Sequence, residues 1–159
     1  MEETIDGIRR FILENVNEYL AGLSDDETPM NAIDAKNIAS GAVDLSRYDA
    51  KVVCAIIPES EIDNDDDIGV YNTRATFTIA FICKGYPQDV LVRQVCRYSA
   101  AFRRAALDDI SLAGAVERSE IGERRFFTDA GTVEKQAVAV EIGLAVTIEE
   151  AVDEYEQEA

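Results

Sequence analysis

The chain has 159 residues, which is the size of one ordinary domain. Apolar residues make up 47% of it and charged residues 30%, a composition that excludes a wholly disordered, collagen-like or low-complexity chain. The 32 acidic residues against 15 lysines and arginines give a formal net charge of −17. So acidic a chain is poorly suited to non-specific binding of nucleic acid, because contacts to phosphates need a cationic surface.

The excess of acid is concentrated in two segments. Glu59 to Asp67 and Glu149 to Glu158 each contain six acids and no base, and the remainder has 20 acids and 15 bases, a net charge of −5. Because densely packed like charges repel, we expect both segments to be loosely ordered, as an acidic loop over residues 58–70 and an acidic C-terminal tail over residues 149–159. They either keep the protein soluble, meet a basic partner, or line a passage to which DNA must not adhere.

The sequence offers little catalytic chemistry. Histidine is absent, which removes the commonest general base and metal ligand. The cysteines, Cys54, Cys83 and Cys96, lie in apolar or amphipathic runs without CxxC spacing, which favours small buried side chains over a zinc or disulfide site. The segment from Asp63 to Gly69 is similar to the start of a calcium loop but lacks the required Gly and Glu, which leaves at most incidental cation binding. We therefore predict a protein that is not an enzyme, without cofactor or metal.

The N-terminus leads directly into an amphipathic pattern, without a basic segment followed by an apolar one. No apolar run approaches 18 residues. We therefore expect a soluble, non-secreted protein without a membrane span, made in a reducing cytoplasm.

Helical spacing of apolar residues predicts two helices. The first spans residues 3–21 and ends at Gly22, and the second follows Pro87 and ends near Ala106. The apolar residues of the second helix share one face: Leu91, Val95, Tyr98, Phe102 and Ala106. On the opposite face lies a stripe of three arginines: Arg93, Arg97 and Arg104. This stripe is either a solvated surface or a contact for an acidic segment of a neighbouring copy.

Alternating patterns and turn residues predict the rest of the fold. Residues 24–46 form a long polar connection with a short strand near residues 35–38. The further strands are predicted over residues 51–57, 71–84, 116–127 (an edge strand with a bulge at Gly122) and 133–148. The order of elements predicts one two-layer α+β domain over residues 1–148. In it, two helices cover one face of a mainly antiparallel sheet of four to five strands.

Four segments in the second half carry a resemblance to a known family. They are the strand ATFTIAFICKG, the helix RQVCRYSAAFRRAAL, the segment DDISLAGAVERSEI and the closing strand VAVEIGLAVTI. In order and character they resemble the tail-terminator or tail-completion (head–tail joining) proteins of the neck of tailed bacteriophages. That family has an L-x-G-x-V turn, whose place is taken by Leu112-Ala113-Gly114-Ala115-Val116. The resemblance covers about residues 3–148, and the polar stretch from Ser24 to Ser46 has no counterpart that we can place.

The resemblance implies a structural virion protein that is assembled in the cytoplasm of the bacterial host. Such a protein forms a homo-oligomeric ring, most commonly a hexamer, that ends the tail tube and joins it to the connector of the head. Its neighbours are connector and tail-tube proteins, and DNA passes through an acidic lumen without sequence-specific binding. An alternative of another class is a small non-enzymatic α+β adaptor that dimerises through a sheet edge.

We also predict a subunit interface in which the arginine stripe of one copy faces an acidic segment of the next. The candidate interface residues are Arg93, Arg97, Arg104, Glu59, Glu61, Asp63, Asp65, Asp66 and Asp67.

Overall fold

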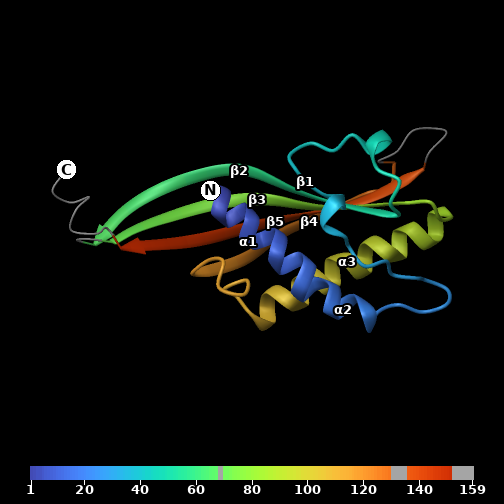
Figure 1. Cartoon of the computed structure of the whole chain (residues 1–159), viewed down its shortest axis with the longest axis horizontal. Coiled ribbons are helices and arrows are strands. Elements are labelled where there is room, and N and C mark those ends of the chain that lie inside the picture. The colour runs from blue at the N-terminus through green and yellow to red at the C-terminus, as the bar shows by residue number, and fades with distance from the viewer. Residues whose placement is uncertain (68–69, 130–135, 152–159) are drawn as a thin grey trace.

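A computed structural model describes residues 1–67, 70–129 and 136–151 (Figure 1). The N-terminal helix consists of α1 (Glu2–Phe11), a π-helical segment (Ile12–Val16) and α2 (Asn17–Ala21), and it ends at Gly22 as predicted. The long helix α3 spans Gln88–Asp108. The strands are β1 (Ile38–Ser40), β2 (Val52–Asp67), β3 (Val70–Lys84), β4 (Arg118–Phe127) and β5 (Ala137–Ala151). The predicted α+β class is confirmed.

The described strands form one sheet in the order β1-β2-β3-β5-β4. Only the short β1 runs parallel to its neighbour, and the other pairs are antiparallel. The register places Cys54, Phe81 and Val140 side by side across β2, β3 and β5. Because side chains alternate between the two faces of a strand, the apolar set of the central strands lies on one face. The sequence alternation of β3 and β5 is thus the pattern that builds the core.

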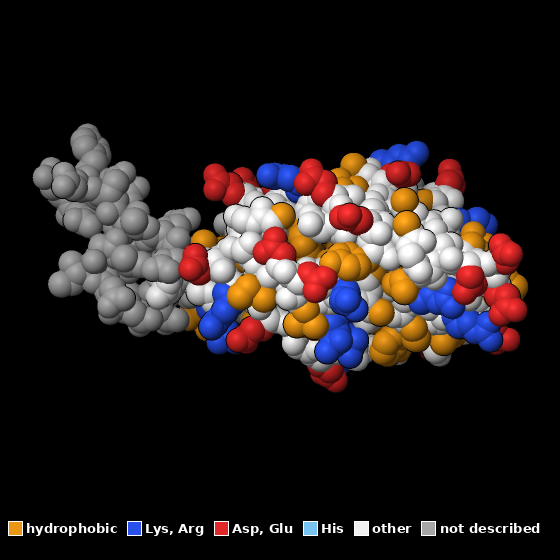
Figure 2. Space-filling view, turned by 90° about the horizontal axis from the view of Figure 1, so that it is seen from below, with side chains coloured by type: hydrophobic (Ala, Val, Ile, Leu, Met, Phe, Trp, Pro, Cys, Tyr) orange, Lys and Arg blue, Asp and Glu red, His pale blue; other side chains and the backbone are white. Residues whose placement is uncertain are grey.

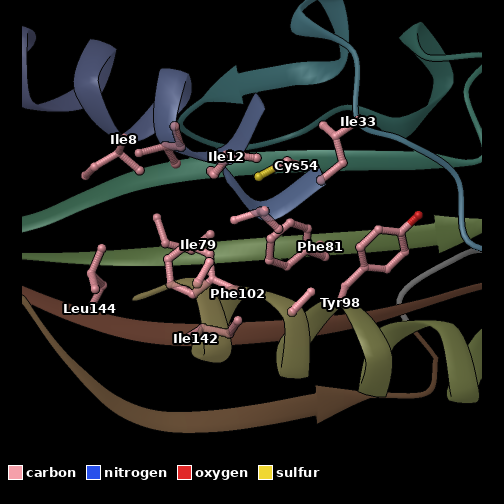
Figure 3. Packing of buried hydrophobic residues seen from close by; sticks show 14 of the residues in the cluster. Ile8, Ile12, Ile33, Cys54, Ile79, Phe81, Tyr98, Phe102, Ile142 and Leu144 are labelled. Atoms are coloured by element: carbon pink, nitrogen blue, oxygen red, sulfur yellow. The ribbon is translucent and has the colours of Figure 1, made fainter. Parts of the chain in front are cut away.

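The helices cover that apolar face, and the core lies between the two layers (Figure 3). Phe102 of α3 is fully buried, with its ring centroid 6.1 Å from that of Phe81 on β3 and 6.2 Å from that of Phe11 on α1. Tyr98 stacks on Phe81 with the ring centroids 5.5 Å apart. Aromatic contacts therefore join α1, α3 and the sheet at one point.

The long polar connection is fastened to the helices by side chains that bind its backbone. Asn17 donates to the Ile33 carbonyl oxygen at 2.9 Å and accepts from the Ile33 N–H at 2.8 Å. Tyr98 makes the same two-way contact with Asn31, and Gln94 donates to the Pro29 carbonyl oxygen at 2.6 Å. These bonds satisfy backbone groups that no strand or helix partner reaches, so the connection follows a defined path across the helices.

The prediction of an acidic loop over residues 58–70 is wrong. β2 continues through Pro58 to Asp67 and stays paired with β3, with bulges between Pro58 and Ser60 and between Asn64 and Asp67. Residues 68–69 lie outside the described part. Charge density predicts a solvated loop, but main-chain hydrogen bonds to β3 fix an extended backbone, and the described acidic side chains still reach water.

Two other predicted boundaries also shift. β5 continues to Ala151, so Glu149 and Glu150 belong to a strand and not to a tail. The remaining tail, residues 152–159, and the predicted start of this strand at Val133 lie outside the described residues. β4 is an edge strand whose register shifts between Ile121 and Arg124, which confirms the bulge predicted at Gly122.

The far ends of β2, β3 and β5 form a three-stranded extension, here called the arm (residues 62–67, 70–74 and 147–151). Figure 1 shows the arm reaching beyond the helices, while α3 lies under the opposite half of the sheet. The part of the acidic segment from residue 62 to residue 67 is therefore held away from the helical layer.

Candidate interaction surfaces

The first surface is the open edge of β2 along the arm. β1 pairs with β2 only at Cys54, Ala55 and Ile56, and within the described chain no strand pairs with this edge from residue 57 to 67. Glu59, Glu61 and Asp63 are exposed there, as predicted from their charge. The backbone of Asp65, Asp66 and Asp67 also belongs to β2, although their side chains lie outside the described part.

Two of these carboxylates are oriented by hydroxyl groups of β3. Thr78 donates to Glu59 at 2.9 Å, and Thr73 donates to Asp63 at 2.7 Å. A neutral hydroxyl fixes the direction of a carboxylate without cancelling its charge. The edge therefore presents ordered negative charge.

The arginine stripe of α3 is not uniform, because Arg97 is used inside the chain. Its guanidinium donates to the carbonyl oxygens of Leu23 at 2.6 Å and Thr28 at 3.3 Å, and it forms an ion pair of 3.1 Å with Asp25. Hydrogen bonds from the Thr28 backbone N–H and from Arg97 hold the pKa of Asp25 below its ordinary value. Arg97 thus fixes the turn after α2, and its charge is paired with Asp25 within the chain.

The other two arginines of the stripe lie at the surface. Arg104 is 3.7 Å from Asp108 one turn along the helix, and Asp108 also accepts a hydrogen bond from Tyr19. That hydrogen bond is the main reason why the pKa of Tyr19 is raised. Arg93 is exposed and forms no ion pair with the described residues. Of the three predicted interface arginines, only Arg93 has its charge unpaired within the described chain.

The second surface is the outer edge of β4, whose side chains were not among the predicted interface residues. Arg118, Arg124 and Arg125 are exposed along it, and Phe126 and Phe127 are 49% and 36% exposed. Arg125 lies 3.2 Å from Glu123, and Arg118 lies 3.9 Å from Glu120, so the pairs along the strand are short-range and solvated. The run Arg-Arg-Phe-Phe at residues 124–127 could have indicated this surface from the sequence, because two adjacent aromatics break the alternation of a half-buried strand.

A hollow of about 670 Å³ lies where the connection before β2 meets the turn after β3, and Lys51, Lys84, Tyr48 and Tyr86 are among its lining residues. The Lys84 ammonium donates to the carbonyl oxygens of Leu45 and Tyr48. The Lys51 ammonium donates to the Gly85 carbonyl oxygen at 3.1 Å and lies 4.9 Å from the centroid of the Tyr86 ring. Both lysines fasten loops to the sheet, which accounts for their positions without a ligand.

The segment at residues 112–116 is a turn held by backbone hydrogen bonds. Leu112, Ala113 and Gly114 all have positive φ, at 51°, 57° and 84°, and Leu112 is fully buried. Asp109 caps the turn by accepting hydrogen bonds from Ser111 and from the Ala113 N–H, and the Ser111 hydroxyl is the main cause of its lowered pKa. The turn therefore has a structural role, since it anchors the strand β4 under the helices.

The cysteines differ from one another. Cys54 and Cys83 are buried as predicted, and burial raises the pKa of both thiols, which makes them poor nucleophiles. Cys96 is exposed, so the prediction of a buried side chain is wrong for it, because the core face of α3 passes through Val95 and Ser99 on either side. In residues 1–67, 70–129 and 136–151, no three Cys, Asp or Glu side chains gather as metal ligands would.

Figure 2 shows side chains of both signs interspersed with apolar ones over the face seen from below, outside the grey region. No helix in the described part of the chain is long and apolar enough to cross a membrane. A scan of the sequence against models of protein families finds no match, and a search of curated proteins finds none either. Functional inference therefore depends on the fold and its surfaces.

Proposed function

We propose that this chain is a structural subunit of a bacteriophage neck, which forms a ring that ends the tail tube and joins it to the head connector. The observation that carries the proposal is the arm, a long three-stranded extension with an acidic open edge. A long arm on a small body is suited to assembly, because it offers contact area outside the core of its own domain. The α+β fold with both helices on one face agrees with the family that the sequence resembles.

The charge of the chain fits a ring around DNA. Phosphates are repelled by a lumen lined with carboxylates, so DNA would pass without adhering or being bound at a specific sequence. In the ring the chain would contact copies of itself and the connector and tail-tube proteins on either side. It would be assembled in the host cytoplasm and end in the virion.

We assign no catalytic step to the chain in this role. The two lysines that line its hollow donate to backbone carbonyl oxygens, and burial raises the pKa of its two buried thiols. The work of a neck subunit is mechanical, and it depends on the contacts between copies.

The alternative is an adaptor that dimerises through a sheet edge, and the open edges of β2 and β4 are what favour it. In a two-fold dimer the same edge meets itself. For β2 this would bring two rows of carboxylates together, which opposes a symmetric pair. A dimer would therefore have to use β4.

Electron microscopy of the purified protein, with the neighbouring genes inspected in parallel, tests the proposal. We expect rings with a central channel, encoded beside genes for portal, capsid and tail-tube proteins. A homogeneous two-fold dimer encoded away from such genes would contradict the neck function and favour the adaptor.

A further inference from the structure

We propose that copies of this chain join edge to edge, so that the open edge of β2 in one copy pairs with the open edge of β4 in the next. This identifies the surfaces of assembly, and it rests on the proposed function only in requiring that the chain assembles with itself. It also replaces the α3 stripe as the basic partner of the acidic segment, since Arg97 is committed to the turn after α2.

The two edges match in length. The open part of β2 runs from residue 57 to residue 67, which is 11 residues, and β4 has 10. Unpaired strand edges are normally covered, shortened or interrupted, because they template pairing with other chains. β1 covers the neighbouring part of β2 at residues 54–56, so an incoming strand is directed onto the arm.

The strand directions allow the pairing. β3 is antiparallel to β2, β5 is antiparallel to β3, and β4 is antiparallel to β5, so β4 runs opposite to β2. A neighbour generated by rotation about an axis along the strands keeps its strand direction. Its β4 would therefore meet β2 in the antiparallel sense, which continues the sheet of the first copy. In the sheet β4 is level with residues 53–62 of β2, so rotation alone overlaps the open edge at residues 57–62, and overlap along the whole edge needs an added shift along the strands.

The charges favour β2 with β4 over β2 with itself. The β2 edge carries six acids between Glu59 and Asp67 and no base. On β4 three exposed arginines, Arg118, Arg124 and Arg125, outnumber the two exposed glutamates, Glu120 and Glu123, with which two of them pair. Like charges directly opposite each other destabilise a strand pair, so two β2 edges repel. A contact between two different surfaces is heterologous, and it closes into a ring or grows into a filament, as a neck protein requires.

Exposed apolar side chains accompany both edges. Ile62 on β2 is 59% exposed, and Phe126 and Phe127 on β4 are 49% and 36% exposed. They are three of the six exposed large hydrophobic residues of the described chain. Edge pairing would bury them, which gives the contact an apolar component that salt does not screen.

A charge-swap experiment on the full chain tests this pairing. The β4 variant (Arg124→Glu, Arg125→Glu) makes the β4 edge acidic, so it repels the acidic β2 edge of the next copy. The β2 variant (Glu59→Lys, Glu61→Lys) makes the β2 edge basic near the body of the sheet, so it repels the arginines of β4 in the next copy. We expect each variant alone to need roughly tenfold or more protein to assemble than the parent at low salt. An equimolar mixture should recover assembly, because each variant then supplies the edge that the other lacks. Sedimentation velocity compares the size of the complexes formed by each variant alone and by their mixture.

The control is a reversed stripe, Arg93→Glu with Arg104→Glu, which should assemble like the parent. If both edge variants assemble like the parent, or if the mixture recovers nothing, the edge pairing is wrong. If only the stripe variant loses assembly, α3 is the interface, and the ring function survives while this inference fails. If the parent protein itself stays monomeric, the ring function and the edge pairing are both wrong. Recovery in the mixture also shows that the edge variants are folded.

Discussion

At the scale of single residues, a close backbone approach constrains the position of α1 against the turn at residues 112–116. Gly7 is buried in the helix, and a Cβ built on it would lie 2.6 Å from the Ala115 Cβ. Real Cβ atoms do not approach so closely, so any larger residue must move the helix or the turn. This contact fixes where the turn, and hence β4, sits under the N-terminal helix.

Gly7→Ala should therefore destabilise the protein, although alanine is by about 1 kcal/mol the better helix former. We expect a net loss of about 1–3 kcal/mol from overpacking. The double variant Gly7→Ala with Ala115→Gly should recover most of it, because the space returns on the other side. Urea unfolding of the two single variants and the double variant measures the coupling. A raised urea midpoint for Gly7→Ala would show that the space between Gly7 and Ala115 accepts a methyl group.

Arg97 and Arg93 make a matched pair on α3, since one is engaged and the other is free in the described chain. Arg97→Ala leaves the carbonyl oxygens of Leu23 and Thr28 without this donor, and we expect a loss of about 1–3 kcal/mol. Arg93→Ala should change stability by less than about 0.5 kcal/mol. Thermal unfolding compares them, and equal midpoints would mean that the turn after α2 does not depend on Arg97.

At the scale of elements, α3 is the element on which the core depends. Phe102 is fully buried between α1, α3 and β3, as the sequence predicted. Phe102→Ala should cost roughly 3–5 kcal/mol, because it opens a cavity where three elements meet. Leu107→Ala on the same helix is the control, since Leu107 is 57% exposed. A similar small loss for both in urea unfolding would contradict the packing of α3 on the sheet.

Elements whose apolar residues are periodic could be predicted from the sequence, and a strand that is fixed by main-chain pairing alone could not. The alternation of β3 and β5 and the helical spacing of α1 and α3 report burial directly, so these elements were located correctly. The acidic half of β2 has no such pattern. It becomes a strand because its main chain pairs with β3, the next strand along the chain, and this pairing does not depend on the character of the acidic side chains.

The contacts of the candidate surfaces could also be predicted only in part. The position of Arg97 opposite the apolar face of α3 followed from helical geometry. Its contacts with Leu23 and Thr28 did not, because they join residues about 70 positions apart. β4 was recognised as an edge, but the pairing that we propose between it and the acidic edge of β2 could be formulated only from the strand order.

At the scale of the whole molecule, three capping carboxylates link folding to pH. Hydrogen bonds lower the pKa of Asp25, Asp44 and Asp109, first from the Thr28 backbone, the Ser46 side chain and the Ser111 side chain respectively. A carboxyl with a lowered folded-state pKa contributes stability above its unfolded value, and this is lost as pH falls through the folded value. The net charge of −17 acts in the opposite direction, because protonation relieves repulsion.

With repulsion screened by high salt, we therefore expect the thermal midpoint to fall as pH drops below about 4. Asp109→Asn should flatten part of that dependence, because asparagine cannot titrate. Calorimetry of the parent and the variant between neutral pH and pH 3 measures it. A parent midpoint that does not change over this range would show that these caps contribute nothing through their charge.

The central claim is that the chain assembles head to tail through two unlike surfaces, and native mass spectrometry of the purified protein over a range of concentrations tests it most directly. We expect a closed complex of defined copy number, six for a hexameric ring, or a series of complexes that grows one chain at a time. A monomer at every concentration, or a dimer that never grows, would contradict the claim.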